Sequence, residues 1–219
     1  IPKNDLMKFH QRIPVMANDV FASFVKKIKT DVDFASLIHA IVDGHGYSLH
    51  SKAFSYAVSM ELFANMFSQG HTLRVRNPVR KGIWRSYLEK FRTIINESSE
   101  LLEEEKKHVL KKVGHINQKT NKDRLIAPFE YQDIALNPED SRILNNRNDL
   151  LHGRFPVSPE VKTLNSENEH LFYVSMRLLT LLNLGILKWV GYIGYTPNYA
   201  RIYGKGKTST ADKDWFVKV

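Results

Sequence analysis

The sequence predicts an all-α fold, a helical bundle that ends in a short non-helical or β-hairpin tail. Three observations predict this fold class. Apolar side chains recur at helical spacing in successive segments between residues 15 and 190. Residues 137–154 carry the start and stop signals of a helix. Beyond residue 190 the composition changes to Gly, Tyr, Lys and Thr, which favours a hairpin or an irregular tail.

Composition limits the class of protein. The chain has 219 residues, enough for one hydrophobic core, and its 42% apolar and 11% aromatic content excludes a disordered chain. It has no cysteine, which excludes disulfides and thiolate metal sites and fits the reducing cytoplasm where we expect it. No signal peptide is visible. Because the chain begins with Ile1 rather than Met, we expect the C-terminal part of a longer protein, a single domain over 1–219 with 191–219 as an appended tail.

The first two predicted helices, residues 5–29 and 32–43, precede a glycine-containing turn. Four potential metal ligands lie around this turn. Their spacing matches no familiar ligand pattern, so we expect turn and surface side chains in preference to a metal site. They are His39, Asp43, His45 and His50.

The third predicted helix, residues 49–68, is apolar on nearly all sides, so we expect it at the centre of the bundle. Glu61 is the one charge in its apolar stretch. A lone carboxylate in such surroundings needs a partner, and Arg147 is the candidate. The alternative is a glutamate that reaches solvent from a partly exposed helix.

Positive charge is concentrated before and within the next predicted helix, residues 82–97. The formal net charge of the chain is +9, which favours a polyanionic partner such as RNA. Basic side chains beside Trp84 can hold a phosphate backbone and stack a base, or they can form a solvated loop around a core tryptophan. The candidate RNA-binding residues here are Arg74, Arg76, Arg80, Lys81 and Arg85.

Two further helices follow from the same patterns. Residues 98–113 predict a charged, exposed helix, from which a polar connector and a short helix or turn lead on to residue 134. The apolar helix at 167–190 approaches membrane length, but Arg177, Asn183 and Lys188 interrupt it. We therefore expect a buried or dimer-forming helix and no membrane span.

The C-terminal tail contains two short segments with strand character, residues 201–205 and 214–219. We expect them to pair as edge strands of a hairpin, or the tail to lie over the bundle. A Gly-Lys-Thr sequence at 206–208 lacks the first glycine of a P-loop, because Arg201 occupies that position, so no nucleotide site is predicted.

Residues 137–154 are the stretch around which the chain is organised. Asn137 can cap a helix with its side-chain oxygen, and Pro138 suits the first turn, where its missing N–H is not needed. The next two residues are acidic and lie at the positive end of the helix dipole. Gly153 favours a helix end. A helix of about four turns is therefore predicted over residues 138–152.

Arg147 occupies an unusual place in this predicted helix. At about 100° per residue it lies at the centre of an apolar stripe of leucine and isoleucine, with Asn148 and His152 one turn apart on the flank. A guanidinium fork holds phosphate, and a histidine exchanges protons near neutral pH. The three side chains favour phosphodiester cleavage by general acid–base catalysis without a metal. The arginine also predicts that the stripe is the rim of a dimer interface rather than a sealed core.

The residues from Arg147 to His152 resemble the R-x(4–6)-H motif of the HEPN superfamily. Their sequence is Arg-Asn-Asp-Leu-Leu-His, and the following glycine makes it similar to the RNxxxHG form of ApeA-like HEPN domains. The resemblance covers roughly residues 34–189, with motif-level support at 143–154. It implies an all-helical, usually dimeric fold. It also implies a metal-independent endoribonuclease of a toxin or antiviral-defence system, as many members of that superfamily are.

The resemblance implies a role for each motif residue. The 2′-hydroxyl of RNA would attack the adjacent phosphorus and leave a 2′,3′-cyclic phosphate. His152 would take or deliver a proton, and Arg147 would stabilise the charge that develops on the phosphate oxygens. Asn148 would orient His152, and Arg154 would add a phosphate contact.

The family often carries a polar residue on an earlier helix that faces the motif, and Glu61 or Asn65 would fill that place. The implied partners are RNA, with tRNA as one candidate, and a second copy of the chain that completes the site at a homodimer interface. No cofactor is implied. Two alternatives stay open. One is a catalytically silent HEPN module for RNA binding or dimerisation, and the other is a structural role, with Arg147 paired to Glu61 and His152 capping its own helix.

Overall fold

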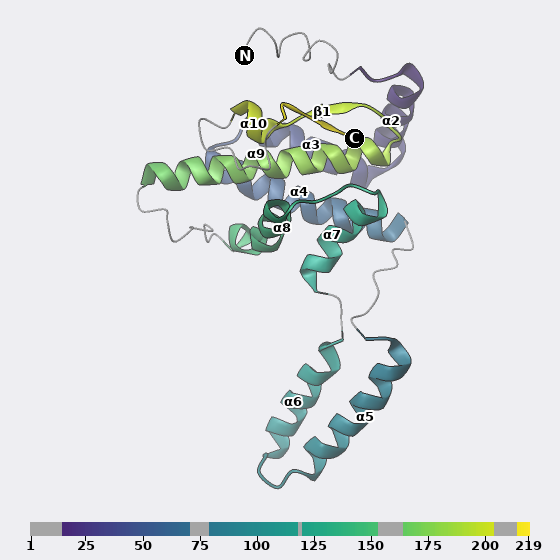
Figure 1. Cartoon of the computed structure of the whole chain (residues 1–219), viewed down its shortest axis with the longest axis vertical. Helices are drawn as coiled ribbons and strands as arrows, with labels where there is room; N and C mark the ends of the chain where they lie inside the picture. Colours follow the sequence, from purple (N-terminus) through teal and green to yellow (C-terminus); the bar gives the residue numbers. More distant parts are fainter. Residues whose placement is uncertain (1–14, 71–78, 118–119, 153–163, 204–213) are drawn as a thin grey trace. The chain divides into compact units, whose positions relative to one another are not determined.

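The computed structural model describes residues 15–70, 79–117, 120–152, 164–203 and 214–219 (Figure 1). Helices dominate it, which confirms the predicted all-α class with a short C-terminal sheet. The helices are α2 (Asn18–Thr30), α3 (Val32–Gly44), α4 (Leu49–Gly70), α5 (Lys81–Glu97), α6 (Glu103–His115), α7 (Asn121–Tyr131), α8 (Pro138–Leu151), α9 (Leu164–Trp189) and α10 (Tyr199–Tyr203), and the strands are β1 (Tyr195–Pro197) and β2 (Phe216–Lys218).

The chain forms two compact units. The larger unit, named the body, comprises Ile1–Leu73 and Leu125–Val219. The smaller unit, named the hairpin, is Arg74–Arg124 and contains the antiparallel pair α5 and α6 (Figure 1). The sequence predicts one domain over the whole chain, so the division into two units is a feature that only the structure adds.

The core of the body is built around α4, as predicted. The long helix α9 packs against it, and at Gly185 an added Cβ would lie 2.6 Å from Cζ of Phe63. Only glycine therefore allows α4 and α9 to approach this closely. The buried α4 residues are Ala53, Tyr56, Ala57, Ser59, Met60, Phe63, Ala64, Met66 and Phe67.

α9 itself is the second layer of this core. By length and composition alone it could cross a membrane, but 72% of its most apolar window is buried inside the body. Burial on this scale is typical of the core helix of a globular domain. The expectation of a buried helix is confirmed.

The tail lies over the body and differs in part from its predicted form. β1 and β2 pair antiparallel, with Thr196 opposite Val217. The predicted strand at 201–205 is wrong in its described residues, because they continue the short helix α10. Asn198 is responsible: its backbone N–H donates to the carbonyl of Trp215 at 2.9 Å, and its Oδ1 accepts from the N–H of Arg201 at 3.3 Å. The chain therefore turns into a helix directly after pairing with β2.

Tyr56 lies inside the core without a polar partner. It is fully buried, and its hydroxyl has no hydrogen-bond partner among the described residues. Burial raises the pKa of Tyr56 to about 12, from an ordinary value near 10. The fold therefore accommodates the neutral phenol and disfavours the phenolate, so this group does not weaken the fold by ionisation at neutral pH. Stability falls as the pH rises from about 10 to about 12, because the unfolded chain ionises first.

Tyr56→Phe is expected to raise the free energy of unfolding at pH 7 by up to about 1 kcal/mol, because it removes an unsatisfied buried hydroxyl. The variant should also lose less stability than the wild type between neutral pH and pH 11. Urea unfolding at both pH values measures this. Tyr47→Phe is the matched control, since Tyr47 is 48% exposed. A loss of stability in Tyr56→Phe at pH 7 would contradict the assignment, because it would mean that the hydroxyl is satisfied.

Candidate functional site

The helix that carries the candidate site begins where the sequence predicts. Asn137 is the N-cap of α8: its Oδ1 accepts from the N–H of Asp140 at 2.9 Å. In return, the N–H of Asn137 donates to Oδ2 of Asp140 at 3.1 Å, which completes a reciprocal capping box. Pro138 occupies the first turn, as predicted. α8 ends at Leu151 with His152 as its C-cap, and Gly153 lies outside the described residues.

Arg147 is buried inside the body, 1% exposed. Its neighbours on the apolar stripe, Ile143, Leu144 and Leu150, are buried as well. Within the single chain this part of the stripe is therefore sealed, which corrects the expectation of an open rim, and a homodimer interface at the site stays a prediction. The stripe packs within its own chain, where α8 contacts α4 and α4 supplies a carboxylate that pairs with the guanidinium. The buried Nε of Arg147 has no hydrogen-bond partner among the described residues.

That carboxylate is Glu61, which forms an ion pair with Nη2 of Arg147. The predicted pairing of these two residues is confirmed. Burial lowers the pKa of the Arg147 guanidinium, because an apolar environment disfavours its charge. The side chain of Glu61 is 20% exposed, so the carboxylate supports Arg147 from the edge of the core. Asn65, the other predicted supporting residue, lies one turn further along α4 and is half-buried.

Asn148 connects Arg147 to the surface. Nη1 of Arg147 donates to Oδ1 of Asn148 at 2.6 Å. This bond fixes the amide so that its nitrogen, Nδ2, is left as the donor. Glu61, Arg147 and Asn148 thus form a continuous series of contacts, named the polar network, from α4 to the outer part of α8.

His152 lies at the end of α8 with its side chain exposed. Its backbone N–H donates to the carbonyl of Asn148 at 3.0 Å and so closes the last turn. The predicted hydrogen bond between the side chains of Asn148 and His152 is absent from the described part of the chain, since the Asn148 oxygen binds Arg147 instead. The structure therefore brings Glu61, Arg147 and Asn148 into contact and leaves the imidazole free to meet a ligand, one turn from Asn148.

A second buried ion pair was not predicted. Nε of Arg177 donates to Oδ1 of Asp140 at 2.5 Å, and Nη2 donates to Oδ2 at 3.0 Å. Both side chains are almost fully buried. From the sequence, Asp140 is expected only as an acidic residue at the start of its helix, and Arg177 only as a charge that interrupts an apolar helix. An arginine within so apolar a helix is a signal that a buried carboxylate partner exists.

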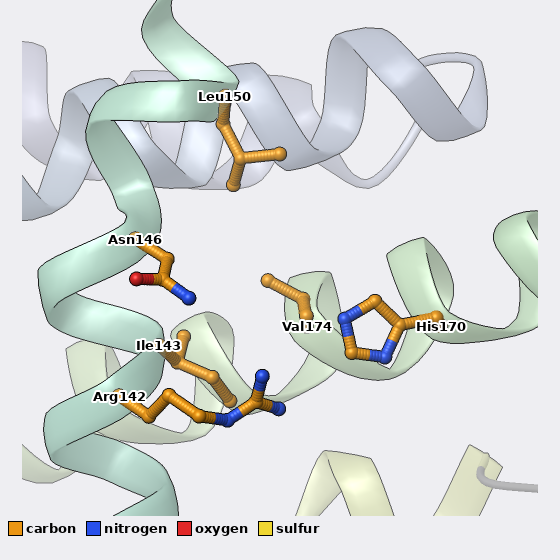
Figure 2. Close-up of a pocket in the computed structure, with 6 residues that line it drawn as sticks. All are labelled: Arg142, Ile143, Asn146, Leu150, His170 and Val174. Carbon is orange, nitrogen blue, oxygen red and sulfur yellow. The ribbon is translucent and has the colours of Figure 1, made fainter. Parts of the chain in front are cut away.

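Two hollows adjoin α8. The first lies between α8 and α9, has a volume of about 10 Å³ and therefore holds at most about one water molecule. Figure 2 shows the six side chains around it: Arg142, Ile143, Asn146 and Leu150 from α8, and His170 and Val174 from α9. The second, named the groove, is an open hollow of about 570 Å³, a size that suits a small molecule or a nucleotide. It is lined by Ala40, Tyr47, His50, Ser51, Phe54, Ser55, Val58, Leu150 and Leu151.

The groove reaches Leu151, the residue before His152 in the chain, but His152 itself is not one of its lining residues. Its lining is mainly apolar, and Tyr47 and Phe54 are each 48% exposed. Aromatic side chains of this kind are the surfaces on which proteins stack unpaired RNA bases. Sequence reasoning did not identify the groove, because its walls come from α3, α4 and α8.

Three of the predicted RNA-binding residues are described by the structure. Arg80, Lys81 and Arg85 belong to the hairpin, and all three are exposed. Arg74, Arg76 and Arg154 lie outside the described residues. Trp84 is half-buried in the hairpin, with its ring 6.4 Å from that of Phe91, centroid to centroid. RNA binding by these cations stays a prediction.

The four potential metal ligands lie on the surface of the body. His39, Asp43, His45 and His50 are all exposed around the α3–α4 connection. Within the described ranges, no group of three or more His, Asp or Glu residues is placed to hold a metal ion.

Comparisons with known proteins assign no family to this chain: no family model, curated protein or solved structure matches it.

Proposed function

We propose that the protein is a metal-independent endoribonuclease of the HEPN type, from a defence or toxin system. One observation carries the proposal. The polar network of Glu61, Arg147 and Asn148 begins in the core and reaches the surface at Asn148, one helical turn before the exposed His152. A buried arginine in an apolar stripe is costly unless it is paired, and such departures from local rules concentrate at functional sites.

The reaction requires two proton transfers. The imidazole of one His152 takes the proton of the RNA 2′-hydroxyl, whose oxygen attacks the adjacent phosphorus. The bond from phosphorus to the 5′-oxygen breaks, and that oxygen takes a proton from a protonated imidazole, the partner subunit's His152. The products are a 2′,3′-cyclic phosphate and a free 5′-hydroxyl. DNA resists, because it lacks the attacking hydroxyl.

The burial of Arg147 supports a different division of labour from the one that the motif implies. A guanidinium that is 1% exposed and paired with Glu61 acts best as a positioning residue. It holds the Asn148 amide with its oxygen inward, so that Nδ2 donates to a phosphate oxygen of the RNA. Arg154 and the hairpin cations are proposed to add phosphate contacts. RNA with unpaired bases fits best, since the groove offers Tyr47 and Phe54 for stacking.

A catalytically silent HEPN module for RNA binding or dimerisation is the second candidate. The same burial favours it, because a guanidinium already paired inside the core is not presented to a phosphate. In that case Arg147 and Glu61 join α8 to α4, and His152 serves as the C-cap alone. The two candidates differ in one measurable property, which is cleavage.

The test is incubation of the purified full chain with total RNA and with a DNA of matched sequence, in EDTA. The proposal expects RNA fragments that end in 2′,3′-cyclic phosphate, identified by mass spectrometry, and intact DNA. Cleavage that disappears in EDTA would overturn the metal-independent mechanism. RNA that is bound but not cut would establish the silent module.

A further inference from the structure

The hairpin is closed at its base by hydrogen bonds, but its apolar core is incomplete. Asn117 is buried at the end of the hairpin where its two chain segments meet, one before α5 and one after α6. Its Oδ1 accepts from the N–H of Val79 at 2.8 Å, and its Nδ2 donates to the Val79 carbonyl at 2.9 Å. Yet among the described apolar residues of α5 and α6 only Ile95 is buried. A pair of helices needs a further layer to cover its apolar surface.

α5 carries one broad apolar face, which divides into two adjacent seams. The inner seam is Trp84, Leu88, Phe91 and Ile95. Ile95 is buried, Trp84 and Leu88 are half-buried, and Phe91 is 40% exposed. The outer seam follows the alternating three-and-four spacing of a coiled coil, and consists of Arg80, Ile83, Tyr87, Lys90, Ile94 and Glu97. At about 100° per residue its members fall within about 100° of one another, so they form one stripe.

The outer seam is exposed along its whole length. Ile83 is 40% exposed, Tyr87 50% and Ile94 66%. The flanking Arg80 and Glu97 are exposed too, and neither forms an ion pair with a described residue. A seam of this pattern, uncovered within the hairpin, is typical of a helix that pairs with another helix.

The order of side chains in the outer seam is complementary to its own reverse. When a second α5 is laid antiparallel, with a twofold axis between Leu88 and Glu89, Arg80 meets Glu97 at both ends. In the same register Ile83 meets Ile94, and Tyr87 meets Lys90. The last pairing is chemically matched, because Lys90 already places its Nζ 5.7 Å from the ring centroid of its own Tyr87. Such self-complementarity is the property of an isologous twofold interface.

The charges of α5 also lack an explanation within the chain. A cation at the N-terminus of a helix and an anion at its C-terminus both oppose the helix dipole, and Arg80 and Glu97 are placed in this way. α6 has the favourable arrangement, with three glutamates in its first turn and Lys112 and His115 in its last. The unfavourable placement on α5 is offset if each charge meets its opposite on another chain.

We propose that the outer seam is a self-association surface, on which α5 pairs antiparallel with α5 of a second copy to form a four-helix bundle with both α6 helices. Charge complementarity selects a second copy as the occupant. The inference goes beyond the proposed function and does not rest on it, because the seam lies in the hairpin and His152 in the body.

The first experiment measures the apolar part of the seam. Sedimentation equilibrium of the full chain, freed of nucleic acid, gives the dimer dissociation constant. Ile94→Ser removes an apolar contact at both ends of the twofold interface and is expected to weaken association by at least about tenfold. Ile116→Ser is the matched control, because Ile116 is 62% exposed on the same hairpin but outside the seam, and it should change nothing. A monomeric wild type, or a dimer unaffected by Ile94→Ser, overturns the proposal.

The second experiment tests the register by charge exchange. Arg80→Glu and Glu97→Arg, made singly, each place like charges together twice and are expected to weaken association by about tenfold at low salt. The double variant Arg80→Glu/Glu97→Arg restores the opposite pairs and should associate like the wild type. Circular dichroism provides the control on folding, since each change improves the fit to the dipole of α5 and should not lower helix content. A double variant as weak as the singles overturns the antiparallel register.

Discussion

His152→Ala is expected to lower the rate of RNA cleavage by about 10²–10⁴-fold, the usual contribution of a general acid–base group. The loss should appear at saturating RNA, because the imidazole acts on the proton transfers rather than on binding. The effect is measured with a defined single-stranded RNA in EDTA, together with RNA affinity by fluorescence anisotropy. Affinity should change little, since the side chain lies at the exposed end of α8.

Two variants make this result specific. His39→Ala removes another exposed histidine of the body and should leave the rate unchanged, so it controls for surface effects. Asn148→Ala keeps the imidazole but removes the proposed donor to the phosphate, so it should reduce the rate less than His152→Ala does. Cleavage at the wild-type rate by His152→Ala would remove this residue from the mechanism and with it the motif-based site.

Features encoded by neighbouring residues could be predicted from the sequence. The start of α8 is one, because Asn137 and Asp140 bond to each other within a single turn. The partner of Arg147 could be predicted as well, although Glu61 is far away in the chain, because a lone carboxylate in an apolar helix requires a cation. Both arguments use the cost of an unpaired polar group, which does not depend on knowing the fold.

Apart from the pairing of Glu61 with Arg147, features that depend on tertiary packing could not be predicted. Helical spacing places Arg147 in an apolar stripe, but it does not say whether that stripe meets its own chain or another, and here it meets α4. Asn198 starts α10 only because it also bonds to Asp214 and Trp215, at the far end of the tail. In each case the deciding partner is distant in sequence.

The ion pair between Asp140 and Arg177 carries the largest expected effect on stability. Arg177→Met is expected to lower the free energy of unfolding by about 3–5 kcal/mol, because it leaves the Asp140 carboxylate buried without its cation. The measurement is urea unfolding followed by circular dichroism. Arg142→Met is the control, since Arg142 pairs with Glu139 on the exposed face of the same helix, and its loss should cost at most about 1 kcal/mol.

The double variant Asp140→Asn/Arg177→Met separates the charge from the cap. Asparagine keeps a side-chain oxygen that accepts from the N–H of Asn137, so the capping box survives while the buried charge is removed. The double variant should therefore be more stable than Arg177→Met alone, which is the non-additivity expected of two residues in direct contact. Equal stability of the two variants would mean that the carboxylate gains water once Arg177 is gone. Because this pair joins the start of α8 to α9, and His152 lies at the other end of α8, the substitutions should lower the melting temperature while leaving the chemistry at His152 intact in the folded protein.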